Sequence, residues 1–176
     1  MLAAACGKPP AVVMDVGAGS GRDAAWLASL NYDVLAVEPS PSLRAEAIRL
    51  HPADSIRWLD ERLPDMAGVI RTGLSADAIL LSAVWMHVRP ADRPRAFRKL
   101  VCLLRSGGLL ALSLREGPAE PSRGMHPVSL PEIERLSEEG HSTPQPQRKQ
   151  LELRALTLAR NQKFGEGSLI EPVTRH

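Results

Sequence analysis

A short apolar stretch that changes abruptly into alternating glycines constrains the fold of this chain more than any other feature. Residues 12–16 read Val-Val-Met-Asp-Val, a mostly β-branched run that is typical of a strand buried in a parallel sheet. Glycines follow at positions 17, 19 and 21, and residues 23–28 are good helix formers. The pattern predicts a strand, a glycine-rich turn and a helix, whose unpaired N–H groups favour a ligand with a negative group.

The spacing of these glycines distinguishes two kinds of nucleotide-binding loop. A dinucleotide fingerprint, G-x-G-x-x-G, has its third glycine where this chain has Arg22. The spacing here is G-x-G-x-G, with Asp15 two residues before Gly17, and the string D-V-G-A-G-S-G resembles motif I of the class I S-adenosylmethionine-dependent methyltransferases. Gly17 and Gly19 are expected to admit the ligand close to the backbone, because glycine tolerates positive φ and has no Cβ.

The composition favours one globular domain. The chain has 176 residues, of which 44% are hydrophobic, so we expect a single domain over residues 1–176 with its core at about 12–139. A net charge of +2 with both signs interspersed, and only 3% aromatic residues, give no indication of a nucleic-acid or membrane surface. Cys6 and Cys102 lack metal or disulfide spacing, which indicates a cytoplasmic protein, and the preference for Arg over Lys favours a bacterial one.

A second strand is predicted over residues 33–37, and Glu38 ends it. Glu38 lies about 20 residues after the glycines, the distance at which a carboxylate at the second strand tip reaches the hydroxyls of a ribose. This feature suits NAD and S-adenosylmethionine equally, and the alternative is an ordinary acid near the start of the next helix. Ser40 and Pro41 predict the N-cap and the first residue of that helix.

A short third strand is predicted over residues 55–58, followed by Asp60 and then by a helix over residues 63–72. In the methyltransferase family an acidic residue at this place often binds the adenine amino group, and Asp60 matches it. A carboxylate accepts hydrogen bonds from an exocyclic amine, so the chemistry fits. The alternative, a solvated acid in a loop, is equally compatible with the sequence.

A strongly apolar fourth strand is predicted over residues 77–82, and the segment A-V-W-M-H-V continues it over residues 83–88. This segment resembles motif IV of the small-molecule methyltransferases and follows a strand's carboxyl end, where ligands bind in open α/β sheets. Trp85 is expected to flank the cofactor. His87 is the best candidate for a general base, because histidine accepts a proton near neutral pH. The alternative is a histidine that packs a loop or caps the next helix.

A helix is predicted over residues 91–104, with Ser106-Gly107-Gly108 as its C-cap and a fifth strand over residues 109–114. The string K-L-V-C-L-L-R-S-G-G-L-L-A-L resembles the helix, Gly-Gly turn and strand that follow motif IV in the family. Three family features therefore occur in the family order.

The remaining pattern completes the expected fold. Ser129 has capping-box spacing to Glu132 and predicts the start of a helix that runs through residue 139, and residues 151–158 alternate like one more strand. The resemblance implies an α/β fold, a three-layer Rossmann-like sandwich with a mostly parallel sheet as in class I methyltransferases. The expected strand order is 3-2-1-4-5, with any final strand antiparallel.

The resemblance implies an S-adenosylmethionine-dependent methyltransferase that acts on a small-molecule acceptor, with S-adenosylmethionine as the cofactor. The sequence has no evident metal-ligand cluster, so no metal is expected. Arg22 directly follows the third glycine and is expected to clamp the methionine carboxylate. His87 is the predicted catalytic residue, and the predicted cofactor-binding residues are Asp15, Gly17, Ala18, Gly19, Arg22, Glu38, Pro39, Ser40, Asp60, Ser82 and Trp85. Two alternatives stay open: a catalytically degenerate S-adenosylmethionine-binding protein and an NAD(P)-binding Rossmann oxidoreductase.

The family usually has one or more helices before the first strand, which cap the cofactor and help to build the substrate pocket. Only a short lead precedes residue 12 here. An open pocket admits water and holds the acceptor poorly. We therefore expect cofactor binding with weak turnover, unless a partner or a second subunit closes the site.

Overall fold

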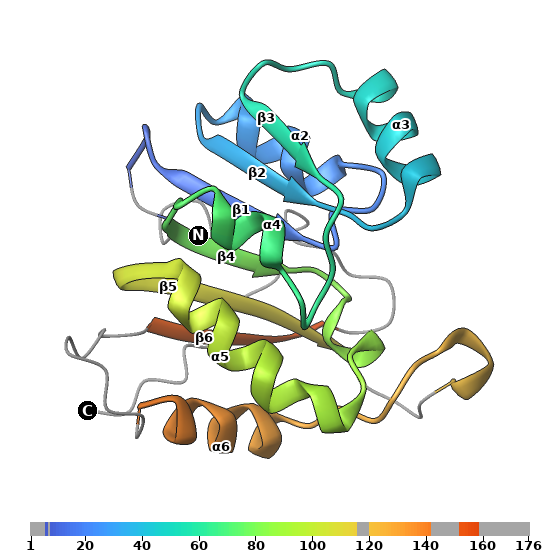
Figure 1. Cartoon of the computed structure of the whole chain (residues 1–176), viewed down its shortest axis with the longest axis vertical. Coiled ribbons are helices and arrows are strands. Elements are labelled where there is room, and N and C mark those ends of the chain that lie inside the picture. Colours follow the sequence, from blue (N-terminus) through green and yellow to red (C-terminus); the bar gives the residue numbers. More distant parts are fainter. Residues whose placement is uncertain (1–5, 7, 116–119, 142–151, 159–176) are drawn as a thin grey trace.

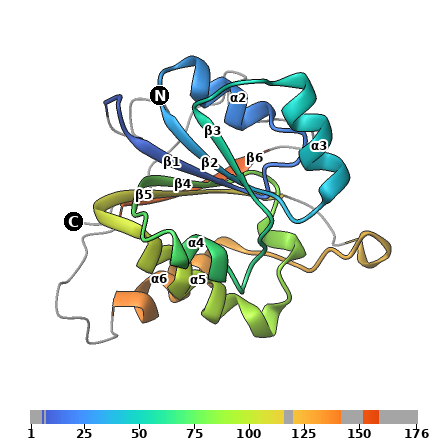
Figure 2. The same cartoon turned by 45° about the horizontal axis from the view of Figure 1, so that its top comes forward.

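The computed structural model describes residues 6, 8–115, 120–141 and 152–158, which form a three-layer α/β structure (Figure 1). Six parallel strands form one sheet in the order β3-β2-β1-β4-β5-β6. The strands are β1 (Val12–Val16), β2 (Asp33–Val37), β3 (Ile56–Leu59), β4 (Ala76–Leu81), β5 (Leu104–Arg115) and β6 (Glu152–Leu158). The helices are α2 (Arg22–Ser29), α3 (Pro41–Leu50), α4 (Ala67–Arg71), α5 (Arg93–Leu103) and α6 (Leu130–His141), with short 3-10 helices η1 (Trp85–His87), η2 (Pro90–Asp92) and η3 (Pro121–Arg123). Helices α2 and α3 cover one face of the sheet, and α4, α5 and α6 cover the other (Figure 2).

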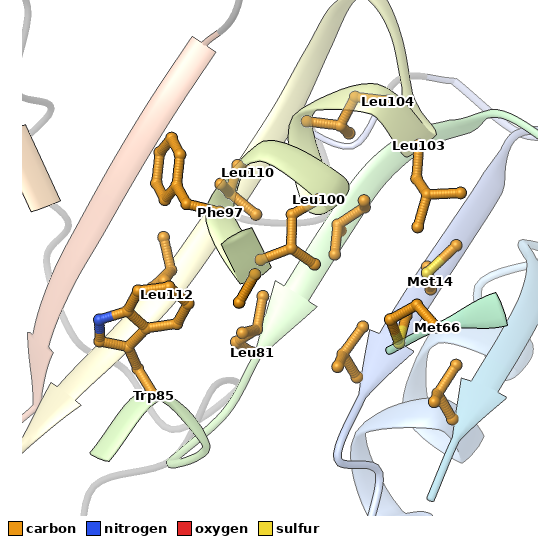
Figure 3. Close-up of a cluster of buried hydrophobic side chains, with 14 of the residues drawn as sticks. Met14, Met66, Leu81, Trp85, Phe97, Leu100, Leu103, Leu104, Leu110 and Leu112 are labelled. Atoms are coloured by element: carbon orange, nitrogen blue, oxygen red, sulfur yellow. The ribbon is translucent and has the colours of Figure 1, made fainter. Parts of the chain in front are cut away.

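The central position of β1 explains its nearly continuous apolar sequence. Met14 packs into the cluster on the side of α4, α5 and α6 (Figure 3), whereas Val13 packs with Leu27 of α2 on the opposite face. A strand covered on both faces does not alternate apolar and polar residues. Because β1 pairs with β2 on one side and with β4 on the other, the predicted order of the first five strands and the three-layer Rossmann-like sandwich are confirmed.

Local sequence signals account for several element boundaries. Strands β1 and β2 have the predicted bounds. Helix α3 begins at Pro41, and Oγ of its N-cap residue Ser40 accepts a hydrogen bond from the N–H of Leu43 at 3.4 Å. Helix α4 is shorter than the predicted helix over residues 63–72, because Met66 directly before it has a left-handed backbone, with φ of 50°.

The turn at residues 106–108 is not the C-cap that the sequence predicts. Helix α5 ends at Leu103, and β5 begins at once with Leu104. The pairing of β5 with β4 then jumps from Leu104 to Leu109, which marks a bulge. Gly107 has φ of +76° inside this bulge. The glycines therefore serve an irregularity of the strand and do not end the helix.

The final strand β6 runs parallel to β5, so the expectation of an antiparallel final strand is wrong. The residues of β6 pair in parallel register with residues 109–115 of β5. Helix α6 lies between these strands in the chain and packs on the face that α5 also covers (Figure 1). A helical crossover of this kind produces a parallel neighbour. The additional strand that the alternation predicts is confirmed for residues 152–158, and residue 151 lies outside the described residues.

Candidate functional site

The glycine-rich loop after β1 is anchored to the tip of β2. The N–H groups of Gly17 and Ala18 both donate to the carbonyl oxygen of Val37, at 2.7 and 3.0 Å. Gly17 and Gly19 have φ of +74° and +57°. A left-handed backbone costs a residue with a Cβ roughly 1–2 kcal/mol, so the path of the loop favours glycine at both positions.

The two glycines differ in their surroundings. A Cβ on Gly17 would lie 2.4 Å from Cγ2 of Val84, in the segment after β4. A Cβ on Gly19 would meet no atom of the described residues within 4 Å. Gly17 therefore serves the packing between two loops, and the open space beside Gly19 is the place where a ligand can approach the backbone.

Glu38, at the end of β2, is hydrogen-bonded to this same glycine. Only 6% of the residue is exposed, and Oε2 accepts from the N–H of Gly19 at 2.8 Å while Oε1 accepts from the N–H of Ser40 at 2.9 Å. A carboxylate has about four acceptor positions, so about two are left for a ligand. Glu38 is thus held in one orientation with the capacity to accept from a pair of hydroxyls, and its ribose contact stays a prediction.

Helix α2 begins directly after the loop, and its N-cap residue Gly21 has no side chain to cap it. The first N–H groups of the helix therefore depend on acceptors from elsewhere. The N–H of Ala24 is hydrogen-bonded to the carboxyl group of Asp15. Arg22 is half exposed and pairs with Asp23 at 3.5 Å. A guanidinium beside a helix start whose N-cap is glycine suits a carboxylate ligand, and the predicted clamp stays a prediction.

Asp15 is buried beneath the loop, with 1% of the residue exposed. Its burial, together with the negative charges of Asp23 and Glu38, raises the pKa of this carboxyl from 3.8 to about 8, despite the hydrogen bond from Ala24. Among the described residues, Oδ2 has no hydrogen-bond partner. The carboxyl group is therefore protonated at neutral pH and has an unused oxygen, which fits a polar group of a ligand.

The tips of β2 and β3 are joined by Arg44, a residue of α3 that the sequence analysis missed. Its guanidinium donates to the carbonyl oxygen of Glu38 and to the carboxylate of Asp60. Asp60 and Pro39 are exposed, and Ser40 is partly buried. The structure therefore brings the predicted residues of both strand tips to one edge, and their ligand contacts stay predictions.

The segment after β4 turns sharply through Ser82 and Ala83. Ala83 has φ of +57°, and its N–H donates to Oγ of Ser113 at 2.6 Å. Ser113 is a buried residue of β5, and Ser82 is partly buried at the carboxyl end of β4. Ser113 is not among the residues predicted from the sequence, although a lone hydroxyl within an apolar strand is a signal for a buried polar contact.

Trp85 lies in the core. The residue is fully buried, and its ring meets the ring of Phe97 edge-on, with centroids 6.3 Å apart and an interplanar angle of 81° (Figure 3). Such an arrangement is favourable for two aromatic rings. The expectation that Trp85 flanks the cofactor is therefore corrected: helix α5 provides an apolar partner, and the ring packs against it.

His87 is exposed in η1, close after the carboxyl end of β4. Its Nδ1 lies 3.3 Å from the carbonyl oxygen of Gly124. Because a carbonyl only accepts, this contact requires a proton on Nδ1 and leaves Nε2 of the neutral ring as an acceptor. The N–H of His126 donates to the carbonyl oxygen of Met86 at 2.8 Å and holds the two segments together. This geometry suits a general base, and the catalytic role stays a prediction.

Arg93, at the start of α5, binds three other segments of the chain through hydrogen bonds. The residue is 2% exposed, and its Nε donates to the carbonyl oxygen of Val88 at 3.0 Å. Its Nη1 donates to the carbonyl oxygen of Pro127 at 2.9 Å and to Oε2 of Glu132 at 2.6 Å. Glu132 therefore does not complete the predicted capping box, although its N–H donates to Oγ of Ser129 at 3.4 Å. Nothing in the sequence separates Arg93 from the other arginines of its helix.

The arrangement suits the binding of a ligand that has hydroxyl and anionic groups. It also suits a proton transfer to a histidine beside that ligand. The carboxyl ends of β1 and β2 lead to Glu38, the open face of Gly19 and the start of α2, and the carboxyl end of β4 leads to His87. Within the described residues, no group of three or more His, Cys, Asp or Glu side chains is placed to hold a metal ion. Of the described helices, none is both long enough and apolar enough to cross a membrane.

Comparisons with known sequences agree with this geometry. The model of the methyltransferase domain family matches residues 14–112, more than half of the chain. Uncharacterized methyltransferases of Mycobacterium bovis and Mycobacterium tuberculosis are each 32% identical to this chain over 102 residues. The match covers 57% of this chain and 38% of each relative, so the chain spans well under two thirds of their length.

Solved structures show a similar fold. A TehB-like SAM-dependent methyltransferase of Corynebacterium glutamicum has a TM-score of 0.58 at 20% identity, over 80% of this chain and 70% of that chain. The 1,6-didemethyltoxoflavin-N1-methyltransferase of Burkholderia thailandensis, solved with bound 1,6-didemethyltoxoflavin and S-adenosylhomocysteine, has a TM-score of 0.56 at 22% identity. That match covers 80% of this chain and 67% of the other. At these identities the likeness concerns the fold alone.

Proposed function

Because this chain belongs to the methyltransferase domain family, we propose that it is an S-adenosylmethionine-dependent methyltransferase whose acceptor is a small molecule. S-adenosylmethionine is the cofactor of the family that the glycine spacing resembles. The observation that supports the proposal most directly is the hydrogen bond between Glu38 and the N–H of Gly19, at 2.8 Å, beside an open face of the loop. An NAD(P)-dependent oxidoreductase is disfavoured by Arg22 in place of the third glycine and by the family match.

The chemistry of the site residues fits S-adenosylmethionine. Glu38 would accept from the ribose hydroxyls, and Asp60 from the adenine amino group. Arg22 and the N–H groups at the start of α2 would hold the methionine carboxylate. Asp15, whose Oδ2 has no partner among the described residues, would take a polar group of the methionine part. The proposed cofactor site also includes Gly17, Ala18, Gly19, Pro39, Ser40 and Ser82.

The proposed mechanism requires positioning and one proton transfer. S-adenosylmethionine, when bound, supplies a methyl group that is already activated on a sulfonium. The chain itself has to align the acceptor and remove its proton. Nε2 of His87 would accept this proton, since the contact with Gly124 places the ring proton on Nδ1. The hydrogen bonds of Arg93 would keep the surrounding segments in place.

The setting of this activity is part of the proposal. The Burkholderia thailandensis protein was solved with a small molecule and S-adenosylhomocysteine bound, which supports a small-molecule acceptor here. The relatives are bacterial, and the sequence spacing of Cys6 and Cys102 is that of neither a disulfide nor a metal site, so we propose one domain in the bacterial cytoplasm.

The test is acceptor-dependent formation of S-adenosylhomocysteine from S-adenosylmethionine. The protein is incubated with small molecules that present hydroxyl, amino or thiol nucleophiles, and product is measured with and without each acceptor. We expect at least one class to raise product formation above the rate without acceptor. Tight binding without turnover would favour the catalytically degenerate alternative, and absence of both binding and turnover would contradict the proposal.

A further inference from the structure

The guanidinium of Arg44 connects two strand ends that both belong to the proposed cofactor site. Nη1 donates to the backbone carbonyl oxygen of Glu38 at 2.5 Å, and Nη2 donates to Oδ2 of Asp60 at 2.8 Å. Strands β2 and β3 are direct neighbours, and the N–H of Glu38 also donates to the carbonyl oxygen of Leu59 at 3.1 Å. One side chain from α3 therefore holds the ends of two adjacent strands together.

The two members of the Arg44–Asp60 pair differ in exposure. Only 17% of the Arg44 side chain is exposed, against 65% of the Asp60 side chain. The guanidinium is planar with donors in fixed directions, so two engaged donors leave it little freedom. A carboxylate as exposed as that of Asp60 would otherwise rotate freely. Its orientation therefore depends on the mostly buried arginine beside it.

We propose that Arg44 is a positioning residue that makes Asp60 select a 6-aminopurine over a 6-oxopurine at the nucleobase end of the site. The inference rests on the proposed function, since it requires a nucleoside ligand at this place. Arg44 engages Oδ2, and Oδ1 can accept from the exocyclic amine of adenine. Hypoxanthine presents an acceptor oxygen at that position instead, with its donor at the neighbouring ring nitrogen. A mobile carboxylate would shift to that donor, whereas a carboxylate held by Arg44 cannot, and this difference produces the selectivity.

Helix α3 offers a matched control for this arginine. Arg49 pairs with Glu46 at 2.7 Å, and both side chains are exposed, at 67% and 48%. Arg49 and Arg44 are thus both engaged with carboxylates, but the Arg49 pair lies within a single helix. Removing Arg49 tests the effect of losing a positive charge from α3 without releasing Asp60.

The experiment compares the Kd values of S-adenosylhomocysteine and S-inosylhomocysteine, measured by calorimetry on the full chain. Wild type and Arg49→Leu should prefer the adenine ligand by about tenfold or more, the effect of one mismatched hydrogen bond. In Arg44→Leu the preference should fall to roughly threefold or less. Arg44→Lys, which keeps the charge but lacks the fork, should lie between them. Asp60→Asn should lose the preference, and Arg44→Leu in that background should change it no further.

The ratio of the two Kd values separates positioning from a structural role. Partial unfolding of a variant weakens both ligands equally and leaves their ratio unchanged. An unchanged ratio in Arg44→Leu, or an equal loss in Arg49→Leu, overturns the inference. If wild type binds both ligands equally, the inference fails while the proposed function stands. If wild type binds neither, the proposed function fails and the inference fails with it.

Discussion

Glu38 accepts two backbone hydrogen bonds, and these hold its carboxylate beside the open face of Gly19. In the proposed site, removal of this carboxylate would leave the ligand hydroxyls without their acceptor. Glu38→Ala should therefore weaken S-adenosylhomocysteine binding by about 1–3 kcal/mol in calorimetry. Glu46→Ala, which removes an exposed carboxylate from the neighbouring helix, is the control and should bind like wild type. Unchanged affinity in Glu38→Ala would remove Glu38 from the site.

Asp15 predicts a specific dependence of stability on pH. Its pKa is raised to about 8 in the folded chain from 3.8, so between these values the unfolded chain has released the proton and the folded chain has kept it. Rising pH therefore favours unfolding between these two values, and the free energy of unfolding falls by up to about 1.4 kcal/mol per pH unit. The stability that the protonated carboxyl contributes is fully present below pH 3.8 and is lost as the pH passes about 8.

Asp15→Asn removes this titration, so the variant should gain stability relative to wild type as the pH rises. Urea unfolding between pH 5 and 8 measures the difference in the free energy of unfolding between the two proteins. A difference that stays constant over this range would show that Asp15 does not hold a proton in the folded chain.

His87 is expected to act on turnover and not on cofactor affinity. With Nδ1 engaged by Gly124, Nε2 would accept the proton of the substrate in the proposed mechanism. His87→Ala should lower the rate by about 10²–10⁴-fold while S-adenosylhomocysteine binds as before. His126→Ala is a matched control, because its backbone N–H still reaches Met86. Full activity in His87→Ala would show that the histidine is only structural.

At the scale of elements, the contact between the glycine-rich loop and the segment after β4 predicts a contrast between two glycines. In Gly17→Ala the new Cβ would meet Val84, so we expect a loss of about 2–4 kcal/mol in the free energy of unfolding. Val84→Ala, added to the Gly17→Ala variant, should restore part of this lost stability. Gly19→Ala has no such clash and should lose only about 1–2 kcal/mol, but its Cβ would block the ligand.

Urea unfolding and calorimetry on these three variants test that contrast. Gly17→Ala should be the less stable protein and Gly19→Ala the weaker binder. Equal stability of the two single variants would contradict the assignment of Gly17 to loop packing. Normal S-adenosylhomocysteine binding by Gly19→Ala would contradict the assignment of Gly19 to the ligand side.

The elements that local chemistry decides were predictable. The β-branched run of β1 and the Ser40–Pro41 start of α3 are local signals, and both elements begin where the sequence predicts. The bulge at residues 106–108 was not predictable, because Ser-Gly-Gly suits a helix end and a strand irregularity equally and the pairing with β4 decides between them. The missing capping box at Glu132 was not predictable for the same kind of reason. Its carboxylate pairs with Arg93, which lies in a segment distant in the sequence.

The same division applies to the site. The glycine spacing and the position of Glu38 predicted the loop and the carboxylate that the structure joins by a hydrogen bond. Trp85 was misassigned because sequence position cannot tell a ring at a strand end from one that packs on Phe97. Arg44 and Ser113 were missed because their roles depend on partners that tertiary packing brings near.

At the scale of the whole molecule, alternating strands and helices predicted the layers and the order of the first five strands. A helix between two strands implies a crossover, and crossovers on both faces place β1 at the centre. Strand β6 is parallel to β5, as the crossover rule implies for strands joined by a helix. The prediction of an antiparallel final strand was wrong because it was taken from the family resemblance. The helical crossover through α6 therefore predicts the direction of β6 better than the family resemblance does.

Calorimetric titration of the chain with S-adenosylhomocysteine and with NAD tests the central claim most directly. We expect saturable one-to-one binding of S-adenosylhomocysteine and no binding heat from NAD, because the loop has the glycine spacing of the former's binding proteins and Arg22 replaces the third glycine of a dinucleotide loop. Absence of S-adenosylhomocysteine binding, or saturable binding of NAD in its place, would contradict the account.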